Sequence, residues 1–428
     1  MALVGGCPNS EVNDQTPSGD DDSSPGVNCE IALDVPTERI WPEEGELFYQ
    51  QVGLGGFSLG ESAIVVGPTG KVVLIDVGNN SHDDDIATEL TALLSNMNAN
   101  GGYANGPFAT NEIDHAIITH MHADHSDGLG DLLMNWQLQG KIIHRGLVDI
   151  TAAAGESAVE QLCGVLAANP QADFPICVGT SSPPCTAGQW VGTYPATGCP
   201  GLDAGDIEVD GDSGRTVLDL GGGAQVEVLA ANATIGSERY VDVVGPLHQS
   251  DSNGENARSV TGVVQHGAFR LLFAGDLTGG GSDTDAVEGF YAERFSQYSE
   301  IGPLGVDVLH AGHHGRDTSS SLPWVNALLP IDGRSRNVVI GISTAHLDSP
   351  HTEPIANLLD SQRLTDGFAW TTDITIAGST HPRLLNANGG QVLIKTTNSG
   401  SAYTVQLISD TGDILQTQSY WAVGYCQD

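Results

Sequence analysis

The chain has 428 residues, 39% of them hydrophobic, so it can bury a substantial core in one large domain or two ordinary ones. Its 54 acidic and 15 basic residues give a formal net charge of −39, which argues against broad, non-specific nucleic-acid binding. Such an acidic, lysine-poor composition suits saline surroundings, where salt screens self-repulsion. No apolar run of about 18 residues occurs, so no membrane-spanning helix is predicted.

The first residues predict a surface anchor. Leu3-Val4-Gly5-Gly6-Cys7 resembles the end of a bacterial lipoprotein signal, in which the cysteine is lipidated. Residues 8–28 are rich in Ser, Asp, Pro and Gly, which predicts a flexible tether. We therefore expect residues 1–28 to be a lipoprotein-like start and acidic tether. The body, residues 29–428, is expected to be a monomer outside the cell, at its surface or in the periplasm, with Cys7 its only membrane attachment.

The cysteines predict disulfides. If Cys7 carries lipid, six cysteines remain, and none of the seven belongs to a CxxC pair. An even number fits an oxidising compartment. The pairs that would close short loops or join the ends of the body are Cys163–Cys177, Cys185–Cys199 and Cys29–Cys426, although other pairings stay open.

Strand-like and helix-like segments alternate from about residue 46. Two apolar runs, 63–66 and 72–75, flank the turn Gly67-Pro68-Thr69-Gly70, which predicts a hairpin. Apolar residues at helical spacing predict a helix over 84–97. A buried strand, a helix and a strand are then expected over 116–118, 129–136 and 141–144.

The alternation of strand-like and helix-like segments stops at residues 148–212. This stretch holds four cysteines and several prolines, and it has no clear sheet pattern after a helix near 156–168, so we expect an insertion. Strands are expected beyond it over 226–229, 260–265, 270–273, 306–309, 338–342, 391–397 and 402–408, with helices near 284–298 and 354–364. Two strand-rich halves with interspersed helices predict an α/β (α+β) protein, a four-layer αββα sandwich.

The strongest chemical signal follows the expected strand at 116–118. It is Thr119-His120-Met121-His122-Ala123-Asp124-His125, on a strand-to-helix loop. Three imidazoles and a carboxylate within six residues are the donors that zinc and similar metals prefer. His120 and His122 can address one ion from an extended segment, and Asp124 and His125 can address a second as the chain turns.

This HxHxDH pattern resembles the metallo-β-lactamase superfamily. Residues 65–78, VVGPTGKVVLIDVG, are similar to its opening hairpin, which ends in Asp-x-Gly. By this resemblance Asp76 supports the metal loop through hydrogen bonds. Phe273-Ala274-Gly275-Asp276 resembles the strand whose final carboxylate bridges both metals, which implies that Asp276 is the bridge.

The segment Val306-Asp307-Val308-Leu309-His310-Ala311-Gly312-His313-His314-Gly315 is similar to one branch of the superfamily. That branch includes the hydrolase domain of ComEC-type DNA-uptake proteins and the phosphorylcholine esterases of teichoic acids. Asn256-Ala257-Arg258-Ser259-Val260 also resembles its N-x-x-S element. The resemblance implies that either His313 or His314 completes the second metal site, and spacing does not decide which. We expect His310 to be a packing residue.

Two further positions bear on the site. His351 stands where this branch carries a His-Pro element, which makes it a candidate for binding or protonating a substrate oxygen, with His346 a weaker rival. A metal histidine common elsewhere in the superfamily is absent, because the strand 226–229 runs into Ala230-Ala231-Asn232. We do not expect His248 to replace it. This gap counts against β-lactam hydrolysis.

The resemblance implies a hydrolase with two divalent ions, with zinc the default and manganese or iron alternatives. Two such ions about 3.5–4 Å apart lower the pKa of a shared water and yield a hydroxide nucleophile. Asp124 would orient it, and His351 would assist the leaving group. We expect a phosphodiesterase whose substrate is small or polymeric, either a phosphocholine-type diester or nucleic acid. The negative charge disfavours long DNA except at high salt. The alternatives are a carbonyl hydrolase for a lactone, β-lactam or ester, and a non-catalytic surface binding protein.

Overall fold

A computed structural model describes residues 33–56, 58–145, 161–165, 168, 173–175, 216–236, 238–247, 252–280, 284–295, 298, 301–345, 349–374 and 381–425. The lipoprotein-like start, the tether, most of the 148–212 insertion and every cysteine except Cys163 lie outside these ranges. The predictions for anchoring and disulfide pairing therefore stay predictions. No helix in the described ranges is both long and apolar enough to cross a membrane.

The first large sheet joins both ends of the chain. Its nine described strands run in the order β21-β20-β19-β1-β2-β3-β5-β7-β8. The pairs from β21 to β3 are antiparallel, and those from β3 to β8 are parallel. The bounds are β1 Phe48–Gln51, β2 Ala63–Val66, β3 Val72–Ile75, β5 His115–Ile118, β7 Ile142–His144, β8 Asp173–Pro175, β19 Gln391–Thr396, β20 Ala402–Ile408 and β21 Ile414–Trp421.

The second large sheet has ten described strands. Its order is β12-β11-β10-β13-β14-β15-β16-β17-β18, with β9 also paired to β10. The strands from β14 to β18 are parallel. The bounds are β9 Thr216–Gly221, β10 Ala224–Ala231, β11 Thr234–Ile235, β12 Glu238–Arg239, β13 Thr261–His266, β14 Phe269–Phe273, β15 Val308–His310, β16 Asn337–Ile340, β17 Ala369–Thr371 and β18 Leu384–Asn386. A small parallel pair joins β4 Glu112–Ile113 and β6 Gln137–Leu138.

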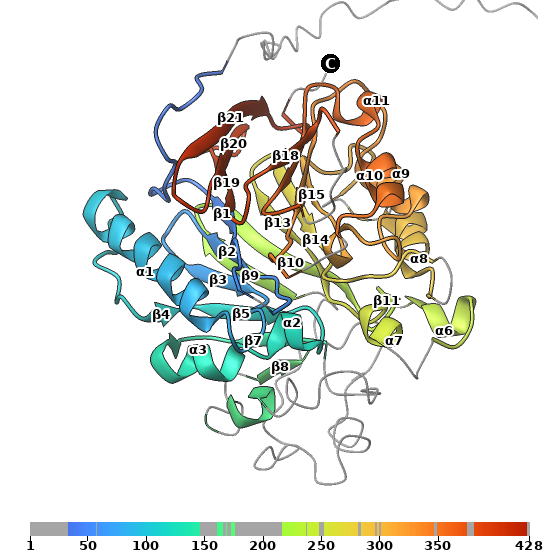
Figure 1. Cartoon of the computed structure of the whole chain (residues 1–428), viewed down its shortest axis with the longest axis horizontal. Helices are drawn as coiled ribbons and strands as arrows, with labels where there is room; N and C mark the ends of the chain where they lie inside the picture. The colour runs from blue at the N-terminus through green and yellow to red at the C-terminus, as the bar shows by residue number, and fades with distance from the viewer. Residues whose placement is uncertain are drawn as a thin grey trace, which may run out of the picture.

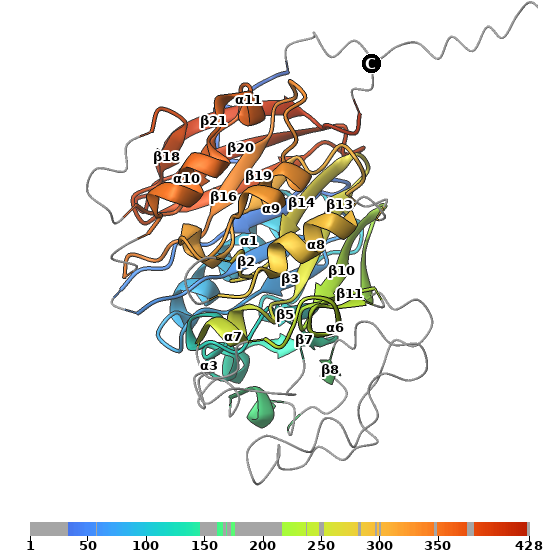
Figure 2. The same ribbon diagram turned by 90° about the vertical axis from the view of Figure 1, so that its right-hand side faces the viewer.

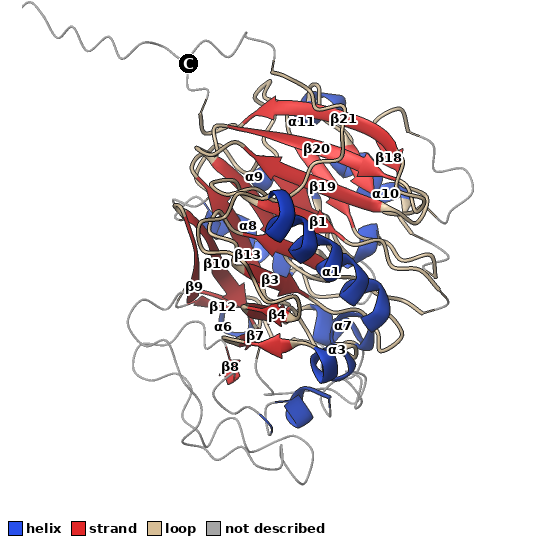
Figure 3. Ribbon diagram, turned by 90° about the vertical axis from the view of Figure 1, so that its left-hand side faces the viewer, coloured by secondary structure: helices blue, strands red, loops and turns tan. Residues whose placement is uncertain are grey.

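Helices cover the outer face of each sheet. The core beyond the first sheet is shared with α1 Asp83–Asn100 and α3 Leu129–Asn135. The core beyond the second sheet is shared with α8 Val287–Phe295, α9 Leu322–Leu328 and α10 Thr352–Leu358. Figure 1 shows α1 on one side of the sheets and α8 to α10 on the other, and Figures 2 and 3 view these two sides face on.

Strand sequences explain the layering. In β2, Ile64 and Val66 pack toward the helices, whereas Ala63 and Val65 pack between the sheets. Because side chains alternate along a strand, a strand buried on both faces must be apolar throughout. The core between the sheets draws on both, for example Val73 from the first and Val308 from the second. The predicted four-layer αββα sandwich is confirmed.

Several elements differ from the sequence predictions. The helix expected near 354–364 is two helices, because the Asp360 side chain accepts a hydrogen bond from the Gln362 backbone and starts α11 Ser361–Leu364. A strand, β8, lies within the insertion where no sheet pattern was seen. It has only three residues and ends in Pro175, which an edge strand tolerates.

Candidate metal centre

The candidate site is built from loops at the carboxyl ends of parallel strands. The loops after β3 and β5 carry Asp76 and His120–His122, and the short helix α2 Ala123–Ser126 that follows carries Asp124 and His125. The segments after β14 and β15 carry Asp276 and His313–His314. Open parallel sheets place ligands at this edge. In the sandwich, the two sheets bring these edges together, so segments some 200 residues apart share one site.

Asp76 fixes the segment 119–125, the metal loop expected from the sequence, by hydrogen bonds. Its Oδ1 accepts from the Thr119 backbone N–H at 2.7 Å, and its Oδ2 accepts from the Thr119 hydroxyl at 2.7 Å. The same Oδ2 lies 2.8 Å from His125 Nδ1. A carboxylate at Nδ1 leaves the other ring nitrogen of His125 available as a metal ligand.

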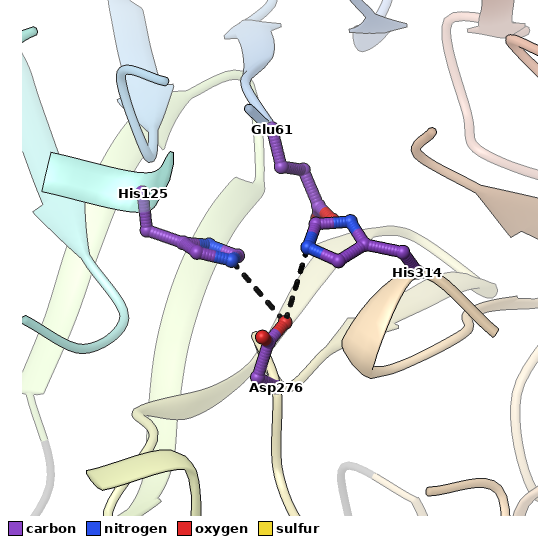
Figure 4. Close-up of side chains that lie close together, drawn as sticks. All are labelled: Glu61, His125, Asp276 and His314. Atoms are coloured by element: carbon purple, nitrogen blue, oxygen red, sulfur yellow. Dashed lines mark ion pairs between the residues drawn. The ribbon is translucent and has the colours of Figure 1, made fainter. Parts of the chain in front are cut away.

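Asp276 stands between two groups of histidines. Its Oδ2 lies 3.8 Å from His120 Nε2 and 3.6 Å from His313 Nε2. Its Oδ1 lies 3.2 Å from His125 Nε2 and 3.8 Å from His314 Nε2. Each carboxylate oxygen therefore faces a different set of imidazoles, as Figure 4 shows for the His125 and His314 side.

Gly275 allows Asp276 to reach this position. It has a φ of +50°, and a Cβ there would lie 2.5 Å from Thr119 Oγ1. A side chain would therefore collide with the metal loop as well as strain the backbone. The close approach of the two loops depends on glycine here.

The histidine pair adopts an uncommon backbone conformation. His313 and His314 both have positive φ, at 50° and 52°, within a 3₁₀ turn that spans His313–Gly315. Non-glycine residues rarely occupy this region, and such strain concentrates at functional sites. The turn places the two rings on opposite oxygens of Asp276, so one histidine faces each side of that carboxylate.

Donor atoms gather into two clusters that share Asp276. One consists of His120, His122 and Asp276, and the other of Glu61, His125, Asp276 and His314, with the donor atoms of each cluster within 4.8 Å of one another. Asp124 borders the second cluster, because its Oδ2 lies 3.5 Å from His314 Nε2 and 4.0 Å from His125 Nε2. Nitrogen and oxygen donors in this arrangement suit zinc, manganese or iron.

The carboxylates of the second cluster raise the pKa values of its histidines, which shows that they favour positive charge there. Burial lowers the pKa of His125, but the carboxylates of Asp276, Asp76 and Asp124 outweigh it and hold that pKa well above its ordinary value. Burial likewise lowers the pKa of His314, yet Asp276, Asp124 and Glu61 raise it to about 10. The same contacts, against the effect of burial, hold the pKa of Asp276 well below its ordinary value.

Unsatisfied polar atoms show that the site fits metal ions. Among the described residues, buried His122 Nε2, His125 Nε2 and Asp276 Oδ1 have no hydrogen-bond partner. His125 Nε2 and Asp276 Oδ1 lie 3.2 Å apart as an ion pair. Buried polar atoms without partners are costly, and ligation of a cation would satisfy them together.

Two buried contacts that the sequence did not reveal brace these loops. Glu255, in α7 Ser252–Asn256, accepts from the Met121 backbone at 2.9 Å and is paired through both oxygens with Arg145. Glu61 carries the second contact, to His310 and His314. Each glutamate is a buried acid that directly follows a single glycine, a signal too common to be specific.

The remaining predicted residues belong to neither donor cluster of the described residues. His351 is in neither cluster of the described residues; its Nδ1 lies 3.3 Å from Asp317 Oδ1, and its backbone N–H donates to Gly315. His310 is buried as expected but also ion-paired. At the position of the missing histidine, Asn232 donates to the Arg145 carbonyl at 2.6 Å. His248 and His346 lie outside the described residues.

Comparisons with known proteins identify part of this site. The model of the metallo-β-lactamase superfamily matches residues 58–161, which include Glu61, Asp76 and the HxHxDH segment. This range is less than half of the chain. A search of curated proteins finds no match.

Solved structures show only weak overall likeness. A subclass B3 metallo-β-lactamase from a soil metagenome is 15% identical, with 64% of this chain and 80% of that chain covered and a TM-score of 0.27. A motif mutant of a Cronobacter sakazakii metallo-β-lactamase is 16% identical, with coverages of 65% and 79% and a TM-score of 0.30. The chemotaxis sensor ODP, solved as a peroxy diiron species, is 10% identical, with coverages of 63% and 84% and a TM-score of 0.29. Scores this low carry no conclusion, so the fold rests on the strand order and layers above.

Proposed function

We propose that this chain is a dinuclear metal-dependent hydrolase of the metallo-β-lactamase superfamily. The observation that carries the proposal is the position of Asp276, whose two carboxylate oxygens face two separate groups of imidazoles. One carboxylate bridging two ions is the arrangement of many two-metal hydrolases. The superfamily match over residues 58–161 supports the same conclusion.

The donor geometry assigns residues to two positions. The first would be held by His120, His122 and Asp276 Oδ2, and His313, 3.6 Å from that oxygen, would take the place of the histidine missing at Asn232. The second would be held by Asp124, His125 and His314 with Asp276 Oδ1. When bound, two divalent ions activate a water molecule and neutralise charge on substrate oxygens. Zinc is the first choice, with manganese or iron alternatives.

The protein's own residues then orient the reaction. Asp76 locks His125 and Thr119 in place, which reduces the reorganisation needed during turnover. Asp124, whose side chain is 19% exposed, would orient an incoming water. We propose that His351, which is paired with Asp317 and whose backbone N–H donates to Gly315 beside His314, holds a proton for a leaving group.

Within this class we propose phosphodiester hydrolysis. The support is the G-H-H-G turn with its N-x-x-S partner, which resembles the branch that includes phosphorylcholine esterases. In the structure these two segments meet, because Asn256 Nδ2 lies 3.4 Å from His313 Nε2. The net charge of −39 favours a small diester over long DNA.

The test is a substrate panel with and without a chelator. Bis-p-nitrophenyl phosphate, a nuclease substrate, a lactone and a chromogenic β-lactam would be compared on the metal-loaded chain, and we expect the diester to be cleaved best. The Asp276→Ala variant should lose turnover by at least about 100-fold, because both ions share that carboxylate. Preferred hydrolysis of the lactone or β-lactam would replace the phosphodiesterase assignment, and near-native turnover by Asp276→Ala would reject the two-metal site.

A further inference from the structure

Glu61 occupies a central position between the two halves of the site. It lies two residues before β2 and is 5% exposed. Its backbone N–H donates to the Asp124 carbonyl at 2.9 Å, and its own carbonyl accepts from the Gly78 N–H at 2.9 Å. The Glu61 backbone is thereby fixed to the metal loop and to the turn after Asp76.

The Glu61 side chain crosses to the opposite sheet. One carboxylate oxygen, Oε1, lies 3.0 Å from His310 Nε2, and Oε2 lies 2.9 Å from His314 Nδ1. His310 and His314 are 3% and 1% exposed. Burial raises the pKa of Glu61, but the two histidines outweigh burial and hold that pKa below its ordinary value. The carboxylate therefore lies buried between two imidazoles.

Gly341 makes room for this arrangement. Its carbonyl lies 2.9 Å from His314 Nδ1, so it shares that nitrogen with Glu61. A Cβ at Gly341 would lie 3.1 Å from Glu61 Cδ and 2.5 Å from Gln51 Nε2. The absence of a side chain at 341 lets the carboxylate approach His314.

The contact is similar in distance to one on the other side of the site. There Asp76 Oδ2 is hydrogen-bonded to His125 Nδ1, whereas His314 Nδ1 is hydrogen-bonded to the Gly341 carbonyl and has Glu61 Oε2 as its ion-pair partner. Asp76 lies 2.8 Å from His125 Nδ1, and Glu61 lies 2.9 Å from His314 Nδ1. In both cases the Nε2 atom faces Asp276 Oδ1. A carboxylate at Nδ1 fixes the orientation and tautomer of a metal-binding imidazole and raises its basicity.

We propose that Glu61, itself held by His310, is the positioning residue for His314 and controls occupancy of the second metal position. This inference rests on the proposed two-metal function. Glu61 also lies within reach of the second cluster as a ligand. Its two oxygens each face an imidazole, however, so the geometry favours action through His314 over direct ligation.

Cobalt titration tests the proposal. The full chain, stripped of metal, is titrated with Co²⁺ while the visible d–d spectrum and the number of ions bound are recorded. We expect two ions on the unaltered chain. Glu61→Ala should keep the affinity for the first ion and weaken the second by about 10- to 100-fold. Glu61→Gln, which keeps one acceptor oxygen, should lose less affinity for the second ion than Glu61→Ala.

Three comparisons separate positioning from other roles. His310→Gln, which keeps a donor toward Glu61, should bind the second ion more tightly than His310→Ala. The double variant Glu61→Ala/His314→Gln should be no worse than His314→Gln alone, because Glu61 acts through that ring. Asp307→Asn is the matched control: it alters a fully buried carboxylate at the far end of β15 and should leave both ions in place.

The outcomes are distinct. Binding of two ions by Glu61→Ala with unchanged affinity and spectrum would overturn the proposal, as would equal loss of both ions or additive losses in the double variant. If the unaltered chain binds fewer than two ions, the proposed function fails and this inference fails with it. Two ions on the unaltered chain with no effect of Glu61→Ala would reject the positioning role alone.

Discussion

The two histidines at 313 and 314 are adjacent in sequence but face opposite oxygens of one carboxylate. Both residues lie in the left-handed region, and here that turn divides the pair between the two oxygens of Asp276. His313 is also fixed by a contact from its Nδ1 to the Thr318 hydroxyl. The pair can therefore supply one ligand to each ion.

This division predicts that each metal position can be emptied without emptying the other. His313→Ala should empty the first position and leave the second occupied, whereas His314→Ala should do the reverse, because each removes a ligand from only one side of Asp276. Metal analysis after dialysis, combined with Co²⁺ spectra, would show one ion in each variant with different spectra. The same spectrum from both variants would contradict the assignment.

At the scale of elements, α7 ties the metal loop to the end of β7. Glu255 accepts from the Met121 backbone and is bound through both oxygens by Arg145, and both side chains are fully buried. Breaking such a pair leaves an uncompensated charge in the interior. The pair connects the two sheets at the site.

We therefore predict that Arg145→Ala lowers the free energy of unfolding by about 3–5 kcal/mol. The double variant Arg145→Met/Glu255→Met should be more stable than Arg145→Ala, because no lone charge remains, although the Met121 N–H loses its acceptor. Urea unfolding of the three proteins measures this. Equal stability of Arg145→Ala and the unaltered chain would show that the pair contributes nothing.

Glu288 links α8 to the start of α9. Its oxygens accept from the Ser320 and Ser321 backbone N–H groups at 2.8 and 2.7 Å. Burial raises its pKa from 4.5 to about 7, against the effect of those hydrogen bonds. A raised folded-state pKa means that the folded protein binds the proton more tightly than the unfolded chain.

The proton on Glu288 therefore stabilises the folded protein at low pH and not at high pH. The stabilisation by the proton on Glu288 is complete below the unfolded pKa of about 4.5 and is lost as the pH rises through about 7. Its upper limit is about 3 kcal/mol. Denaturant unfolding measured from pH 4 to 8 should show that the free energy of unfolding falls as the pH rises. This fall should be absent in Glu288→Gln. A parallel loss in both proteins would assign it to other groups.

For the whole molecule, the net charge of −39 is the dominant long-range force. Self-repulsion of this size destabilises a compact chain, and salt weakens it as the screening length falls from about 30 Å at 0.01 M to about 3 Å at 1 M. We predict that Tm rises by several degrees between 0.05 and 1 M NaCl, measured on the metal-loaded chain. A flat or falling Tm would remove the argument for a saline habitat, which stays a prediction together with the extracellular location.

The sequence alone determined the layers and the first half of the site. Strands such as 63–66 and 72–75 are apolar throughout, and a strand buried on both faces leaves no other pattern, so the sandwich could be predicted. The HxHxDH segment was equally clear, because its donors lie within six residues and need only a local turn to converge.

Only the tertiary structure decided how distant segments meet. It places β19 to β21, from the end of the chain, in the first sheet, and it brings Glu61 against His310 and His314 and Glu255 against Arg145. Neither glutamate has a local signature, because what distinguishes it is its partner some 100 to 250 residues away. The assignment of His313 and His314 to opposite sides likewise depended on backbone angles that spacing does not encode. Local periodicity specifies elements and short motifs, whereas the pairing of buried charges depends on how the two sheets pack together.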